Sequence, residues 1–174
     1  MKSVFKKLTF VTALALVSLM TKPSLALDNS TKGTDGNYIG AGISAGVTNG
    51  GQNGDAATLG ANIQGRYNVR NAPISVRGSA LFTDENVTLI PTISYDVPIT
   101  NNLNGYLGLG YSFVVDNGEP TPLGNRDSLV LTLGGEAEVA SNVMVYGDTK
   151  FGINAYENSP ASALSLQGGV GYKF

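Results

Sequence analysis

The chain has 174 residues, of which 11 are basic, 13 are acidic and 23 are glycine, and it contains neither histidine nor cysteine. Without cysteine there is no disulfide framework, thiol nucleophile or cysteine-based metal site, and without histidine the hydrolases that depend on an imidazole base are excluded. The excess of acidic residues argues against nucleic-acid binding.

The first 26 residues have the pattern of a secretory signal peptide. Lysines precede an apolar run over residues 8–20, and this run is shorter than the about 20 residues that a membrane-spanning helix needs. The small residues Ser24 and Ala26 predict cleavage after Ala26, which leaves a mature chain of one domain with an acidic net charge. Residues 27–36 are polar and rich in turn formers, so we expect a loosely ordered leader there.

Apolar and polar residues alternate from residue 38 onward. Successive side chains of a strand point to opposite faces, so this period of two predicts strands with one apolar and one polar face. Eight such segments are expected, over residues 39–47, 59–69, 74–82, 87–97, 105–113, 129–139, 143–153 and 164–174.

The connections between these segments alternate in length. Those after the second, fourth and sixth strands are short, at residues 70–73, 100–102 and 140–142, whereas residues 49–56 and 116–126 form longer loops. Outer-membrane barrels have short periplasmic turns and longer outer loops. We therefore predict an all-β fold, an eight-stranded antiparallel up-and-down transmembrane β-barrel.

The fourth predicted strand contains Pro91 in its middle. Proline cannot donate a hydrogen bond to a neighbouring strand, and a closed barrel has no edge strand, where a proline would be tolerated. We therefore expect a local bulge at Pro91. The connection at residues 84–86 is also short for the outer side of a barrel.

The charged residues indicate which face meets lipid. The apolar set of positions in the eight strands contains no charged residue, and the polar set contains four acids and four bases. An eight-stranded barrel has an interior only wide enough for its side chains, so charges inside must pair with one another. In the alternative, a soluble sandwich or barrel with a solvated outer face, this neutrality would be a coincidence. The predicted lumen charge cluster is Arg66, Arg77, Asp96, Glu136, Glu138, Asp148, Lys150 and Lys173.

Aromatic residues of the apolar face gather near both ends of the predicted strands. Transmembrane barrels carry such girdles at the two membrane interfaces. The periplasmic belt would contain Tyr67, Tyr95, Tyr172 and Phe174, and the outer belt would contain Phe82, Tyr111, Phe113 and Phe151.

The last strand, ALSLQGGVGYKF, ends in Phe174 with Val170 and Tyr172 at alternate positions before it. This pattern resembles the C-terminal signal that outer-membrane barrels present to the barrel assembly machinery. Residues 37–174 as a whole resemble the small porin-like barrels of the OmpX, Ail and opacity type. The resemblance implies a monomeric domain in the outer membrane of a diderm bacterium, in contact with lipid and lipopolysaccharide.

No catalytic, cofactor or metal site is predicted, so the chain is not expected to be an enzyme. Glu136 and Glu138 would face the lumen together, and paired carboxylates can act as acid and base, but pairing with Arg66, Arg77 or Lys173 to neutralise the lumen is the simpler role. The expected outer loops are acidic and could recruit divalent cations that bridge lipopolysaccharide, recruit a basic surface partner, or simply be hydrated. Their acidic residues are Asp55, Asp84, Glu85, Asp116, Glu119, Asp127 and Glu157.

The charged inward positions fall mainly near the predicted periplasmic ends of the strands, whereas Gly, Ser, Thr and Asn prevail toward the outer ends. This distribution predicts a charge-plugged lower lumen beneath a shallow polar cup. The sequence therefore favours a structural or surface-interaction scaffold. The alternative is a narrow porin-like channel for ions or very small solutes, and an envelope enzyme is a distant third.

Overall fold

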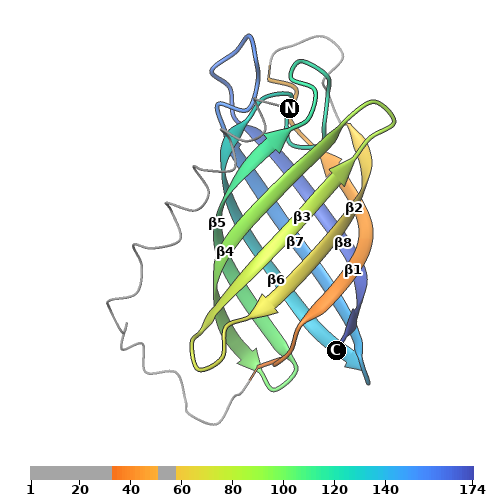
Figure 1. The fold of residues 1–174 in the computed structure, drawn as a ribbon, viewed down its shortest axis with the longest axis vertical. Coiled ribbons are helices and arrows are strands. Elements are labelled where there is room, and N and C mark those ends of the chain that lie inside the picture. The colour runs from red at the N-terminus through yellow and green to blue at the C-terminus, as the bar shows by residue number, and fades with distance from the viewer. Residues whose placement is uncertain (1–32, 51–57) are drawn as a thin grey trace. The chain divides into compact units, whose positions relative to one another are not determined.

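The computed structural model describes residues 33–50 and 58–174 (Figure 1). The predicted signal peptide, its cleavage site after Ala26 and the loop residue Asp55 lie outside the described residues. The described part of the chain contains no helix long and apolar enough to cross a membrane.

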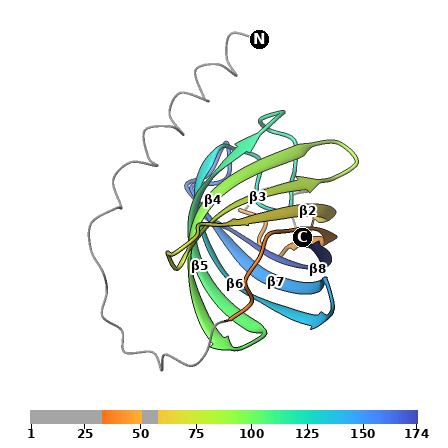
Figure 2. The same cartoon turned by 60° about the horizontal axis from the view of Figure 1, so that its bottom comes forward.

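Eight antiparallel strands follow one another around a closed barrel, in which β1 also pairs with β8 (Figures 1 and 2). The predicted fold class is confirmed. The strands are β1 Tyr38–Gly46, β2 Leu59–Asn68, β3 Ile74–Phe82, β4 Val87–Thr100, β5 Leu103–Val114, β6 Ser128–Ala140, β7 Val143–Ile153 and β8 Ala163–Lys173.

The two ends of the barrel differ in their connections. At one end, here called the turn end, residues 69–73, 101–102 and 141–142 join neighbouring strands, and the C-terminus lies there too (Figure 1). Asn71 and Asn142 adopt positive φ angles of 65° and 63° in these turns, a conformation that asparagine tolerates better than most residues. The other end, here called the loop end, carries the longer connections, including residues 115–127 and 154–162.

The alternation of the sequence sorts side chains between the lumen and the outer surface. Ile43 and Leu59 point outward and are 67% and 71% exposed, whereas the polar Gln64 and Thr132 point inward and are buried. A large apolar surface of this kind is unfavourable in water and favourable in lipid. The pattern is therefore that of a barrel built to sit in a membrane.

The expected bulge at Pro91 is not present. Pro91 lies opposite Gly78 on β3, and the register between β4 and β5 is the same on both sides of it. The N–H of one strand residue points toward one neighbour only, so a proline removes a ladder bond without adding a residue. The register of β4 shifts instead between Pro98 and Thr100, next to the turn.

Inward tyrosines lie against glycines of the adjacent strand. Tyr106 on β5 pairs with Gly134 on β6, and a Cβ atom on that glycine would lie 2.5 Å from Cζ of the tyrosine. Tyr146 on β7 is placed in the same way against Gly169 on β8. The glycines thus make room for large rings inside a barrel whose interior is narrow.

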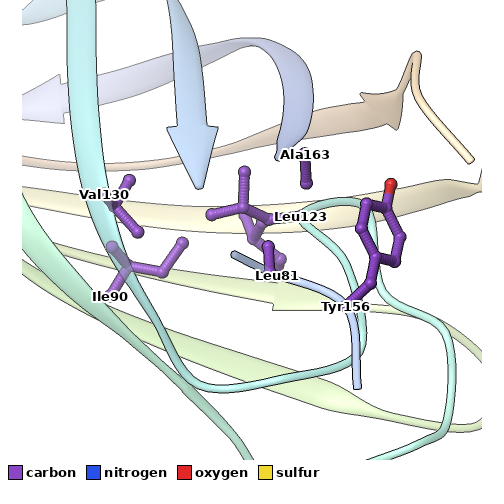
Figure 3. Close-up of a cluster of buried hydrophobic side chains, with 7 residues drawn as sticks. Leu81, Ile90, Leu123, Val130, Tyr156 and Ala163 are labelled. Atoms are coloured by element: carbon purple, nitrogen blue, oxygen red, sulfur yellow. The ribbon is translucent and has the colours of Figure 1, made fainter. Parts of the chain in front are cut away.

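The loop end of the lumen is closed by apolar side chains, not by the shallow polar cup that the sequence predicted. Residues 121–125 of the β5–β6 loop are buried, and Leu123 packs into the centre of an apolar cluster (Figure 3). The prediction failed because the strand pattern does not reveal that a loop folds back into the barrel mouth. We call this cluster the apolar cap; its members are Leu81, Ile90, Leu123, Val130, Ala155, Tyr156 and Ala163.

Candidate functional site

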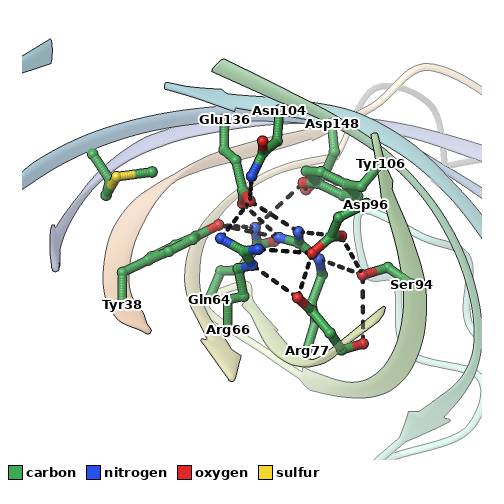
Figure 4. Close-up of polar contacts among 12 residues, drawn as sticks. Tyr38, Gln64, Arg66, Arg77, Ser94, Asp96, Asn104, Tyr106, Glu136 and Asp148 are labelled. Carbon is green, nitrogen blue, oxygen red and sulfur yellow. Dashed lines mark hydrogen bonds and ion pairs between the residues drawn. The ribbon is translucent and has the colours of Figure 1, made fainter. Parts of the chain in front are cut away.

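Four charged side chains meet inside the barrel toward its turn end, and we call them the charge ring (Figure 4). Each comes from a different strand: Arg66 from β2, Arg77 from β3, Asp96 from β4 and Glu136 from β6. All four occupy inward positions of the two-residue repeat, so the alternation of the sequence delivers them to the lumen.

Each member of the charge ring contacts both opposite charges. Arg66 lies 2.8 Å from Asp96 and 3.0 Å from Glu136, and Arg77 lies 3.0 Å from Asp96 and 2.7 Å from Glu136. The four side chains are between 0% and 6% exposed. Burial of a single ion costs several kcal/mol unless it is paired, and this closed cycle leaves no charge uncompensated.

Two serines complete the hydrogen bonding of Asp96. Arg66 donates from Nε to Ser75 Oγ at 2.9 Å, and that hydroxyl donates in turn to Asp96. Arg77 donates from Nε to Ser94 Oγ at 2.8 Å, and Ser94 donates to Asp96 Oδ1 at 3.0 Å. Each arginine is thereby held through its Nη atoms and also through Nε, which makes the ring rigid.

Aromatic and amide side chains surround the ring. The guanidinium carbon of Arg77 lies 3.6 Å from the centre of the Tyr106 ring, a cation–π contact. Tyr106 donates its hydroxyl to Asp148 at 2.9 Å, and Gln64 donates to the hydroxyl of Tyr38 at 3.0 Å. Figure 4 shows Tyr38, Gln64, Tyr106 and Asp148 around the charge ring.

The structure divides the eight predicted lumen charges into three groups. Arg66, Arg77, Asp96 and Glu136 form the charge ring. Asp148 and Lys150 form a buried pair on β7, with 2.9 Å between Nζ and Oδ1. Glu138 and Lys173 pair at the turn end, where both side chains are partly exposed.

The two neighbouring glutamates do not share a site. Glu136 is held by two arginines inside the barrel, whereas Glu138 pairs with Lys173 nearer to solvent. Two carboxylates that work as an acid and base pair must face one reacting group. This arrangement instead uses each carboxylate to neutralise a cation.

Three further residues of the site, Tyr38, Gln64 and Asn104, were not predicted from the sequence. All three point inward on the polar side of the two-residue repeat and are buried beside the charge ring. A search of that side for large uncharged polar residues would have found them. Nothing in the sequence pattern indicated that the segment Gly33–Gly36 contacts Arg66 and Asn104. This segment lies outside the strands and was expected to be a loosely ordered leader.

The aromatic residues of the two expected belts lie on the outer surface, near opposite ends of the barrel. Tyr67, Tyr172 and Phe174 are more than 60% exposed, and Phe151 is 40% exposed. Val170 and Tyr172 follow each other on the outer face of β8, and Phe174 comes directly after that strand. The half-exposed members are Tyr95 at the turn end and Phe82, Tyr111 and Phe113 at the loop end.

Acidic side chains of the described loops lie at the loop end. Asp84, Glu85, Asp116, Glu119 and Glu157 are exposed, whereas Asp127 accepts a hydrogen bond from the backbone of Val114 at 2.9 Å. Within the described residues, no group of three or more acidic side chains is placed to hold a metal ion.

Similar folds occur among solved structures. A designed transmembrane β-barrel matches with a TM-score of 0.55 and 15% identity, over 81% of this chain and 98% of the other. Neisserial surface protein A matches with a TM-score of 0.54 and 17% identity, over 80% of this chain and 98% of the other. At these identities the likeness concerns the fold. No curated protein sequence matches the chain.

The sequence also matches a family model, described as the outer membrane protein β-barrel domain, over residues 11–174. This match includes all eight strands and agrees with the outward apolar surface. The chain therefore belongs to the outer membrane protein β-barrel domain family and is an outer-membrane protein.

Proposed function

We propose that this protein is a structural or surface-interaction scaffold whose lumen does not conduct. The observation that carries the proposal is the charge ring, in which arginines of β2 and β3 pair with Asp96 of β4 and reach Glu136 of β6 across the barrel. The apolar cap provides a second barrier at the loop end. An ion that crosses the lumen would have to break buried ion pairs and also enter an apolar layer.

On this proposal, the outward apolar surface holds the barrel in lipid, next to lipopolysaccharide, and the loop end presents the interacting surface. The acidic loops would suit a basic partner, and the barrel would work as a monomer. The C-terminal strand would engage the barrel assembly machinery through Val170, Tyr172 and Phe174, after export directed by a signal peptide that ends at Ala26.

Single-channel recording in planar lipid bilayers tests the scaffold proposal. The wild-type protein should insert without stable conductance steps, and reproducible steps would contradict it. A stepwise design separates the two barriers. Removal of one cation and one anion of the charge ring together (Arg77→Ser with Glu136→Ser) should leave the barrel without conductance, and so should disruption of the apolar cap (Leu123→Ser). The triple variant should conduct.

A narrow pore is the second candidate, and one observation favours it. Several inward side chains from the charge ring to the loop end have buried polar atoms without a hydrogen-bond partner among the described residues. Buried polar groups of this kind are usually hydrated by internal water. Thr132 and Ser165 flank Lys150 on its two neighbouring strands. The set is Thr88, Thr92, Ser112, Ser128, Thr132, Ser165 and Gln167.

If this hydrated region belongs to a pore, conductance of the wild-type protein should depend on the charge ring. Glu136→Gln should then lower the preference for cations over anions, because it removes a negative charge from the path. Glu138→Gln, at the exposed pair with Lys173, serves as a matched control. Wild-type bilayers without conductance would rule out the pore.

A further inference from the structure

The segment Gly33–Gly36 lies ahead of β1 and is held at the turn end of the lumen by side chains. Asn104 accepts a hydrogen bond from the backbone N–H of Thr34 at 3.1 Å and donates one to its carbonyl oxygen at 2.9 Å. One side-chain amide thus pairs with both polar groups of one backbone residue, as a neighbouring strand would. Thr34 is 3% exposed, whereas the side chain of Asp35 points to solvent.

Arg66 strengthens the same contact. Its Nη1 atom donates to the carbonyl oxygen of Thr34 at 3.1 Å and to that of Gly36 at 3.4 Å. The hydroxyl of Thr34 lies 3.7 Å from Sδ of the buried Met144. Recognition is therefore directed at backbone carbonyl and amide groups and at one small side chain.

The fit requires glycine at position 33. A Cβ atom there would lie 2.1 Å from Oδ1 of Asn104 and 3.0 Å from Cβ of Pro98. The φ angle of Gly33 is also positive, at 67°, which disfavours other residues. The mouth of the lumen is thus shaped around a segment that has glycine in this conformation at position 33.

The segment can leave without stranding a charge. Arg66 keeps its ion pairs with Asp96 and Glu136, and its bond to Ser75, when the backbone of residues 34–36 is removed. Asn104 lies 3.5 Å from Glu136 and retains that contact. Because uncompensated buried charge is the costly outcome, release of the segment is inexpensive in comparison with opening of the charge ring.

We propose that the turn-end mouth is a binding site for a peptide backbone with glycine in the left-handed conformation, and that the chain's own Gly33–Gly36 segment occupies it as a releasable plug. Asn104 and Arg66 are the recognising residues. The plug covers the charge ring from the turn end and exchanges between bound and released states while the barrel stays folded. The inference does not depend on whether the lumen conducts.

Amide hydrogen exchange of the full chain, refolded in detergent micelles, tests this proposal. The amide of Thr34 should be protected relative to an unstructured peptide, but should exchange at least tenfold faster than the amides of residues 39–42 in β1. Tenfold corresponds to about 1.4 kcal/mol. Exchange at the unstructured rate would show that no site holds the segment, and exchange as slow as in β1 would show that the plug is a fixed part of the barrel.

The variant Gly33→Val provides a second test, because it disrupts the fit without altering the charge ring. Thr34 should lose its protection in this variant, while the amides of β1 remain protected. Asp35→Ser is the matched control, since that side chain is exposed, and it should leave Thr34 protected. Unchanged protection of Thr34 in Gly33→Val would overturn the proposal.

A cysteine introduced at Met144 reports on the mouth itself. The chain has no cysteine of its own, so Met144→Cys gives a single label position beneath Thr34. A small neutral thiol reagent should label this position slowly in the wild-type background and at least tenfold faster together with Gly33→Val. Equal labelling rates would contradict a plug that covers the mouth.

Discussion

Arg66 on β2 and Glu136 on β6 lie on opposite sides of the ring of eight strands, and their side chains meet with 3.0 Å between Nη1 and Oε1. The Arg66–Glu136 ion pair therefore bridges the lumen at this level. Glu136 also pairs with Arg77 at 2.7 Å, so one carboxylate ties two strands of the opposite wall to β6.

Glu136→Gln should strongly destabilise the barrel. The variant leaves the two arginines with one carboxylate between them, and loss of one partner of a buried pair costs about 3–5 kcal/mol. Urea unfolding in lipid vesicles measures the loss. Glu138→Gln, whose partner Lys173 is partly exposed, should have a much smaller effect. Equal losses of unfolding free energy in the two variants would show that the charge ring contributes no more to stability than the exposed pair does.

Leu123→Ala should loosen the apolar cap but leave the barrel intact. Truncation of a fully buried leucine removes about 2–5 kcal/mol of packing, and here that packing holds the β5–β6 loop inside the mouth. Trypsin should then cut faster after Arg126, an exposed residue of this loop. Glu119→Ala, at an exposed position of the same loop, is the control and should leave the cleavage rate unchanged.

Gly134→Ala and Gly135→Ala should behave differently although they are neighbours. A Cβ atom at Gly134 would collide with Tyr106 and with Asp148, whereas at Gly135 its nearest atom is a backbone oxygen at 3.5 Å. Overpacking of the first kind costs about 1–3 kcal/mol. Refolding yield, read from the mobility of unheated samples on gels, should fall for the first variant only. A comparable fall for both would contradict the tyrosine–glycine packing.

Leu133→Arg should report on the depth of β6 in the bilayer. Leu133 lies in the middle of the strand and is 65% exposed on the outer surface. An arginine at the bilayer midplane of a barrel costs about 2–4 kcal/mol, and the cost falls to about 0–1 kcal/mol at the interfaces. Val139→Arg, near the turn end of the same strand, should therefore be tolerated in vesicle unfolding experiments. Tolerance of both arginines would argue against a lipid-facing surface.

Phe174→Ala should separate assembly from stability. The Phe174 ring is 69% exposed, and its backbone N–H, which donates to Asn37, is kept in the variant. Refolding of the purified protein should therefore be unchanged. If Phe174 belongs to the signal read by the assembly machinery, the variant should accumulate in the periplasm of a diderm host and be degraded there. Normal insertion of the variant in cells would show that Phe174 is not part of this signal.

The strands could be predicted because successive positions of the repeat face lipid and the lumen in turn. Ile43 and Gln64 illustrate the rule, since the first is outward and the second buried. The need for neutrality predicted that Glu136 pairs with Arg66, Arg77 or Lys173, and in the structure it pairs with both arginines. Which of these cations reach it depends on the register between β2, β3 and β6, which is set by all intervening strand pairs.

The two ends of the lumen were beyond the reach of the strand pattern. Leu123 lies in a loop, and the period of two does not apply where the backbone is irregular. Thr34 lies in a polar segment whose composition indicates disorder, yet its backbone is bound by Asn104. In both places a segment outside the strands packs into one end of the lumen. Such contacts depend on the shape of the folded barrel, which the strand pattern alone does not describe.

The pairing of β1 with β8 has a consequence for how the chain matures. Tyr38 lies opposite Lys173, so the first strand that is made finds one of its two neighbours only after the last strand is complete. Until then both strands present unpaired backbone edges, which invite association with other chains. The pairing of β1 with β8 joins strands that are separated by nearly the whole sequence, and such long-range pairing is slow. The unfinished chain therefore has to be kept apart from its copies for the whole of its passage to the membrane.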